Sequence, residues 1–64
     1  MCEANVYLLD ETGKEVLILD SVDKIVPGKE EIVLENIYSE RKTLRARIKL
    51  MKLVEHRIIL ENLD

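Results

Sequence analysis

Residues 4–19 read ANVYLLDETGKEVLIL, and this stretch decides the fold class. In residues 4–9, strongly apolar positions alternate with others, which is the period of a strand with one buried face. Residues 10–13 read DETG, and Gly13 can adopt the positive φ angle that a tight turn needs. Residues 15–19 are apolar after their first position, which predicts a strand buried on both faces or on one face against a partner chain. The stretch therefore predicts a β-hairpin.

The chain from residue 20 to residue 40 continues this pattern of short segments and turns. Asp20–Val26 predicts a short, irregular third segment, and the Pro27-Gly28 pair after it is the strongest turn dipeptide in the chain. Residues 31–35 read EIVLE and predict another strand, followed by a connection over residues 36–40.

Residues 41–50 read RKTLRARIKL and fit two patterns. Apolar and charged residues alternate as in a strand, but Leu44, Ile48 and Met51 also fit a helical stripe. We favour a strand because every neighbouring segment is strand-like. Residues 53–56 then predict a turn, and Arg57–Leu60 a final strand.

The expected fold is all-β, with residues 1–64 forming a single domain. Regularly spaced short segments of this kind are typical of a small closed or half-open β-barrel of about five to seven strands. Because a chain this short buries little of its surface, we expect a homodimer.

Composition limits the function classes. Ten basic and 13 acidic residues give a net charge of −3, which disfavours general binding to phosphate backbones. The first residues lack the basic and apolar regions of a signal peptide, and no apolar run approaches a membrane span of roughly 20 residues. A single free cysteine in such a chain indicates a cytoplasmic location.

Cys2 is the only cysteine, and it directly follows Met1. If Met1 is retained, its α-amine, the Cys2 amide nitrogen and the Cys2 sulfur form a planar three-donor chelate. That donor set suits Ni(II) or Cu(II). If Met1 is removed, Cys2 offers an amine and a thiolate, and two chains could together supply four donors. Zinc is less well served, because structural zinc prefers four side-chain ligands.

These residues also have more ordinary interpretations. Without family information, an isolated cysteine is more often a small buried hydrophobic residue than a metal ligand. His56 is expected to be a turn residue, with a secondary metal ligand as the less favoured alternative. No phosphate loop, catalytic carboxylate pair or nucleophile with its base can be recognised, so an enzyme is not expected.

A basic stripe is the best argument for nucleic-acid binding. Its members are expected to line one face of the strand over residues 41–50: Arg41, Arg45, Arg47 and Lys49. Nucleic-acid binding by a small barrel usually adds exposed aromatic residues, and only Tyr7 and Tyr38 are available. We therefore favour cross-strand ion pairs with Glu31, Glu35, Glu55 or Glu61, and keep an RNA-binding or protein-interaction module as the alternative.

The chain resembles the CooT family of small nickel-binding proteins. The resemblance begins with Met1–Leu8 and continues through Glu30–Ile37, Arg41–Ile48 and His56–Glu61. The Met-Cys start is its specific motif, and the rest is a hydrophobic pattern.

The resemblance implies a β-barrel homodimer that binds Ni(II) through Cys2. It also implies a role as a metallochaperone or accessory protein, linked in the named family member to nickel supply for carbon monoxide dehydrogenase. A nickel enzyme or its maturation factors are then the expected partners. Relatives have also been labelled RNA-binding, by inference from fold. The chain has no His-rich tail, so nickel storage is not expected.

Overall fold

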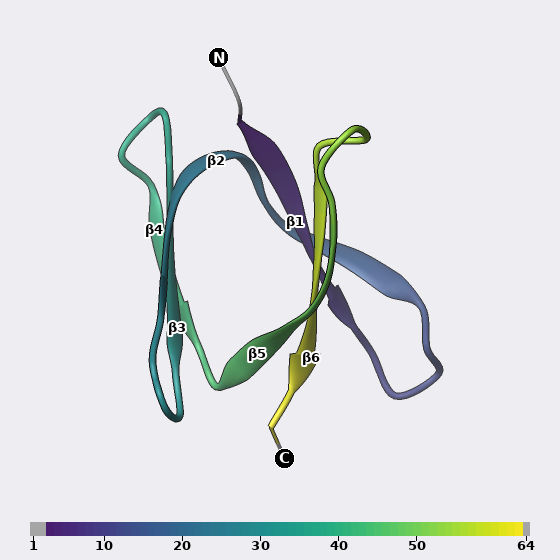
Figure 1. Cartoon of the computed structure of the whole chain (residues 1–64). Coiled ribbons are helices and arrows are strands. Elements are labelled where there is room, and N and C mark those ends of the chain that lie inside the picture. Colours follow the sequence, from purple (N-terminus) through teal and green to yellow (C-terminus); the bar gives the residue numbers. More distant parts are fainter. Residues whose placement is uncertain (1–2, 64) are drawn as a thin grey trace.

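The computed structural model describes residues 3–63, which form six strands in one sheet (Figure 1). The all-β prediction is confirmed for these residues. The strands are β1 (Ala4–Leu9), β2 (Glu15–Pro27), β3 (Ile32–Asn36), β4 (Arg41–Leu44), β5 (Ala46–Lys52) and β6 (Arg57–Asn62).

The strand order across the sheet is β4-β3-β2-β1-β6-β5. Neighbouring strands are antiparallel except β1 and β6, which run parallel and pair Val6 with Ile58 and Leu8 with Leu60. β4 and β5 are the two edges of the sheet, so the sheet curls without closing, and the closed barrel is a wrong prediction. The two edge strands leave their connection at Arg45 in different directions (Figure 1). β4 pairs with β3 and β5 pairs with β6, and β4 and β5 do not pair with each other.

β2 is a single strand of 13 residues, not the two segments that the sequence predicted. Its pairing with β1 shifts register twice, and its pairing with β3 shifts between Val22 and Lys24. Ser21 lies at the bend with a φ of 55°, an unusual conformation for a residue other than glycine. Bulges of this kind bend a strand and increase its twist. They let β2 pair with β1 at one end and with β3 at the other.

Residues 41–50 are confirmed as strand-like, but they belong to two strands separated by Arg45. The helical alternative is wrong. The part of the chain that the structure describes has no helix that could cross a membrane.

The core lies inside the curl of the sheet. It gathers inward-facing side chains from all the strands: Val6, Leu19, Val22, Ile32, Leu34, Ala46, Ile58 and Leu60, with Leu44 and Ile48 packed against them. On β6, Ile58, Ile59 and Leu60 are all buried, so this strand is covered on both faces. The double burial predicted for residues 15–19 is wrong within one chain, because Leu17 is 52% exposed.

Three turns follow their sequence signals. Gly13 has a φ of 84°, and the Asp10 carboxylate accepts hydrogen bonds from the amides of Thr12 and Lys14 at 2.8 and 2.9 Å. Hydrogen bonds, that from the Thr12 hydroxyl first, hold the pKa of Asp10 below its usual value. At Gly28 a Cβ atom would lie 2.9 Å from the carbonyl oxygen of Glu31, so this turn needs glycine. The turn over residues 53–56 is also confirmed.

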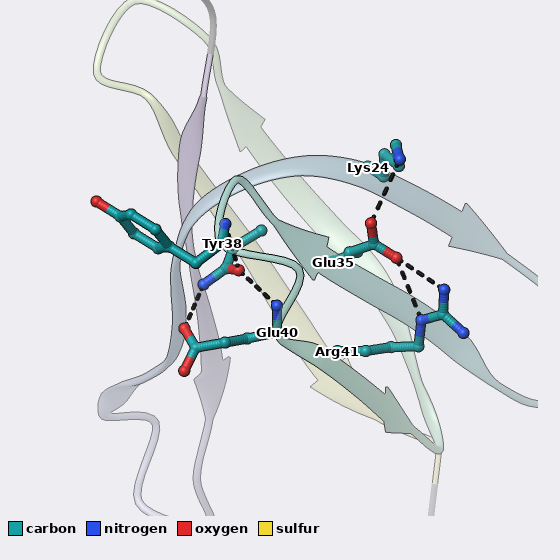
Figure 2. A network of polar contacts seen from close by, with 6 residues as sticks. Lys24, Glu35, Tyr38, Glu40 and Arg41 are labelled. Atoms are coloured by element: carbon teal, nitrogen blue, oxygen red, sulfur yellow. Dashed lines mark hydrogen bonds and ion pairs between the residues drawn. The ribbon is translucent and has the colours of Figure 1, made fainter.

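The turn between β3 and β4 is organised by Asn36, which is 2% exposed. Its side-chain oxygen accepts hydrogen bonds from the amides of Tyr38 and Glu40 at 3.0 and 2.9 Å (Figure 2). Its side-chain nitrogen donates to the Glu40 carboxylate at 2.6 Å. The buried side chain of Asn36 therefore supplies hydrogen bonds that the backbone of this connection would otherwise lack.

Candidate metal site and basic residues

The two predicted metal-binding residues, Met1 and Cys2, lie outside the described residues. The structure does show where the chain next to them lies. Glu3 is half-buried, and β1 begins at Ala4 between β2 and β6.

The start of β1 is held by Asn5. Its backbone N–H donates to the carbonyl oxygen of His56 at 2.8 Å, and its side-chain oxygen accepts from the backbone N–H of Ser21 at 3.3 Å. Both partners are left-handed, with φ angles of 55° at Ser21 and 56° at His56. Non-glycine residues adopt this conformation at a cost, which the surrounding structure must offset. The bend of β2 and the turn after β5 thus meet at β1, three residues from Cys2.

Two recesses open beside this meeting point. A polar recess of about 290 Å³ is lined by Glu3, Asn5, Ser21 and His56. A more apolar recess of about 430 Å³ shares Glu3 and His56 and extends into the open end of the sheet along Ala4, Val22, Asp23, Ile25, Lys52, Leu53, Arg57 and Ile58. His56 is therefore a turn residue, as predicted, whose side chain also borders both recesses.

No group of metal-ligating side chains is recognised among the described residues. In residues 3–63, no three side chains of His, Cys, Asp or Glu gather in a group that could hold one. Glu3 and His56 supply the carboxylate and the imidazole among the residues that line the polar recess. Any metal held at this end of the molecule needs further donors, of the kind that a thiolate and backbone nitrogens supply.

Arg57 is a structural residue that sequence analysis did not single out. It lies over the ring of Tyr7, 4.2 Å from the centroid, and forms an ion pair with Glu15 across β1. Its Nε atom is buried without a hydrogen-bond partner in the described structure. No sequence signal could have placed these residues together, because their contact depends on the parallel pairing of β1 with β6.

The basic stripe is divided between the two edges of the sheet. Arg41 lies on β4, Arg45 lies between the strands, and Arg47 and Lys49 lie on β5. The predicted single strand face is therefore wrong, because the chain changes strand at Arg45. Binding of nucleic acid by these residues stays a prediction.

Two of the cross-strand ion pairs expected from the sequence are confirmed. Arg47 contacts Glu61 at 2.9 Å, and Arg41 contacts Glu35 at 2.8 Å. Glu35 also pairs with Lys24 at 3.3 Å, so it lies between two cations from the neighbouring strands (Figure 2). The hydrogen bond from Arg41, followed by that from Lys24, lowers the pKa of Glu35 from its usual value. Arg41 and Arg47 therefore form ion pairs between neighbouring strands on the surface of the sheet.

Comparison with known proteins decides the family. Residues 1–61 match the family described as CO dehydrogenase accessory protein CooT. The chain belongs to the CooT family. The crystal structure of a protein from Carboxydothermus hydrogenoformans that is assigned to CooT has a TM-score of 0.88 with this CooT chain. The two share 46% sequence identity, and the alignment covers 98% of this chain and 100% of the other. No curated protein matches the chain.

Membership of CooT places the chain among accessory proteins of an enzyme. This agrees with the expectation from sequence that the chain is not itself an enzyme. It also confirms the family resemblance seen in the Met-Cys start and the strand pattern, which now extends over almost the whole chain.

Proposed function

We propose that this chain is a nickel-handling accessory protein that binds Ni(II) through Cys2 and serves the maturation of a carbon monoxide dehydrogenase. The observation that carries the proposal is the position of the only thiol, directly beside the N-terminal amine, in a member of the CooT family. Nickel is the cargo of such a protein, not a resident cofactor.

The Cys2 thiolate supplies the sulfur donor, and the adjacent backbone nitrogen and the Met1 α-amine supply two more. These donors must lose protons before they bind. A thiol has an ordinary pKa of about 8.5 and an α-amine about 7.7–8.0. Nickel binding therefore releases protons and strengthens as the pH rises.

The described structure supports this proposal in two ways. Asn5 fixes the start of β1 to two different segments, so the chelate is attached to a well-anchored strand. Glu3 and His56 line a polar recess at the same end of the molecule, where a cation fits better than it would against the apolar core. The ion can therefore be held near solvent, which suits a protein that passes it on.

The proposal includes a homodimer that acts in the cytoplasm. A chain of 64 residues has a small core, and Leu17 remains about half exposed on the outer face of the sheet. If Met1 is removed, two chains that each supply an amine and a thiolate complete four donors around one ion. Sedimentation equilibrium with and without Ni(II) tests this step, and a monomer under both conditions contradicts it.

The decisive experiment is a titration of untagged protein with Ni(II) near pH 8, followed by ultraviolet-visible absorption. We expect thiolate-to-nickel bands that saturate at one ion per chain or per dimer. Cys2→Ser should abolish these bands and tight binding while leaving the circular dichroism spectrum unchanged. Tight stoichiometric binding by Cys2→Ser would overturn the proposal.

Two matched controls separate the N-terminal chelate from the rest of the recess. His56→Asn keeps a residue that tolerates the left-handed φ of 56°, and it should retain the thiolate-to-nickel bands. A short Gly-Ser extension before Met1 removes the free α-amine from its place beside Cys2 without altering residues 3–63. It should weaken binding whether the native donor amine belongs to Met1 or, after removal of Met1, to Cys2.

A further inference from the structure

The strand β5 presents a free backbone edge. It has seven residues, and within residues 3–63 its ladder partner is β6 alone, with a shift of register between Ile48 and Leu50 that leaves a regular stretch on each side of Lys49. An edge strand of this kind is a template for a further strand. The opposite edge, β4, is only four residues long and carries Lys42 directly opposite the buried Leu34. A charge on the core side of a short edge strand discourages such pairing, so the two edges differ in what they can accept.

Exposed apolar side chains gather at the end of β5 and in the turn that follows it. Single exposed aliphatic residues are ordinary, but several that follow one another in sequence place apolar surface on both faces of one end of β5. Four large apolar side chains in five consecutive positions are exposed here: Leu50 (47%), Met51 (49%), Leu53 (70%) and Val54 (94%). The free edge and this apolar group are continuous along the chain.

The charge of this region is opposite to that of the whole chain. Residues 45–52 read RARIKLMK, with four cations and no carboxylate, whereas the chain has a net charge of −3. Arg47 pairs with Glu61, while Lys49 is exposed on the strand. A partner segment that alternates acidic and apolar residues would match both features.

We propose that the free edge of β5, together with the apolar group at residues 50–54, binds an extended acidic and apolar segment of a partner protein by strand addition. The backbone edge of β5 supplies the main-chain hydrogen bonds of a new strand. Lys49 and its neighbouring cations select acidic side chains, and the exposed aliphatic residues select apolar ones. This docking does not use the Cys2 thiol and does not depend on nickel.

A second copy of the chain fits this edge poorly. When two β5 strands pair antiparallel about Lys49, the two Lys49 side chains face each other. In any register, pairing two copies of β5 brings together two segments that each carry four cations and no carboxylate over residues 45–52. Like charges directly opposite each other destabilise a strand pair. A nucleic acid would use the cations, but residues 45–54 contain no aromatic residue for base stacking. An acidic protein segment is therefore the occupant that the surface favours.

The test uses the full chain, labelled with ¹⁵N and free of metal, and two synthetic peptides. The acidic peptide has the sequence EVEIEVE and the matched basic peptide KVKIKVK, both with blocked termini. Amide NMR spectra should show that the acidic peptide shifts residues 46–54 and slows hydrogen exchange along β5. The basic peptide should bind at least about tenfold more weakly, because several cross-strand charge pairs of about 0.2–1 kcal/mol change sign.

Two charge reversals locate the effect. Lys49→Glu should weaken binding of the acidic peptide by about tenfold. Lys29→Glu, in the exposed turn between β2 and β3, should leave it unchanged. Dispersed amide spectra of both variants verify that they fold.

Three results would overturn the proposal. The first is no binding of the acidic peptide, or shifts centred on β4. The second is a change in the β5 amides on dilution alone, which would identify a second copy as the occupant. The third is tighter binding of a 12-nucleotide oligouridine to the same amides, which would identify a nucleic acid.

Discussion

The two edges of the sheet are built from consecutive segments of sequence, yet they differ in construction. β4 is short, is tied to β3 by the Glu35–Arg41 ion pair, and follows a turn that is organised by the buried Asn36. β5 is longer, packs its inner face on the core through Ala46 and Ile48, and ends in an exposed apolar turn. Polar contacts define the β4 edge and apolar contacts define the β5 edge.

This difference shows how a small open sheet can protect one edge and leave the other available. Protection at β4 needs no large core, because a short strand with an inward-side lysine accepts few partners. For the β5 edge to accept a further strand, β5 must stay ordered although it pairs with β6 alone. Ile59, 3% exposed, provides that support, because it pairs with Leu50 on one side and with Tyr7 on the other.

Removal of the Ile59 side chain should have the largest effect on the stability of the β5 edge relative to the β4 edge. Ile59→Ala leaves a cavity between β1, β6 and β5, and it should lower the free energy of unfolding by about 2–5 kcal/mol. Hydrogen exchange should accelerate at β5 and β6 more than at β4. Urea denaturation and amide exchange measure the two quantities. Equal acceleration at both edges would show that the edges are not separately supported.

Asn36→Ala is the corresponding substitution at the β4 edge. It leaves the amides of Tyr38 and Glu40 without their side-chain acceptor, which should cost about 1–3 kcal/mol. Exchange should accelerate at β4 while β5 is unchanged. Tyr38→Ala is the control, because the Tyr38 side chain is exposed and only its backbone is used. An effect of Tyr38→Ala as large as that of Asn36→Ala would contradict this account of the turn.

Glu35→Gln should weaken the β4 edge by a smaller amount that depends on pH. The folded pKa of Glu35 is lowered by Arg41 and Lys24, so its contribution is present above the usual pKa of 4.5. The contribution is lost as the pH falls through the lowered pKa. Thermal unfolding should therefore separate the wild type from Glu35→Gln at pH 7 and not in strong acid. High salt should also reduce the difference, since the ion pairs are exposed.

Much of this fold could be predicted from residue patterns. The hairpin over residues 4–19, the turns at Gly13 and Pro27-Gly28, and the final strand follow from alternation and turn chemistry, which are local. The parallel pairing of β1 with β6, the bend at Ser21 and the break at Arg45 could not be predicted. Each depends on how distant strands fit around one core, and residue 45 continues the same alternation on both sides of the break.

The candidate site divides in the same way. Cys2 and Met1 are recognised from sequence because their chemistry depends only on neighbouring positions. The Asn5 contacts with Ser21 and His56, and the Arg57–Tyr7 contact, join residues far apart in the sequence. Bulges and left-handed residues create these contacts, and nothing in the neighbouring sequence indicated a positive φ angle at Ser21 or His56. The surroundings of the predicted chelate therefore needed the structure.

The smallest effect on stability should come from Lys42→Ile, which makes the β4 edge resemble the β5 edge. Lys42 is exposed, so its replacement should change the free energy of unfolding by less than about 0.5 kcal/mol. Its position opposite Leu34 means that the new side chain extends the apolar inner face to the edge. Self-association should therefore increase with protein concentration in sedimentation velocity. Lys29→Ile, which places the same side chain in a turn, should not produce this increase. If the two variants associate equally, general hydrophobicity and not the position of Lys42 protects the β4 edge.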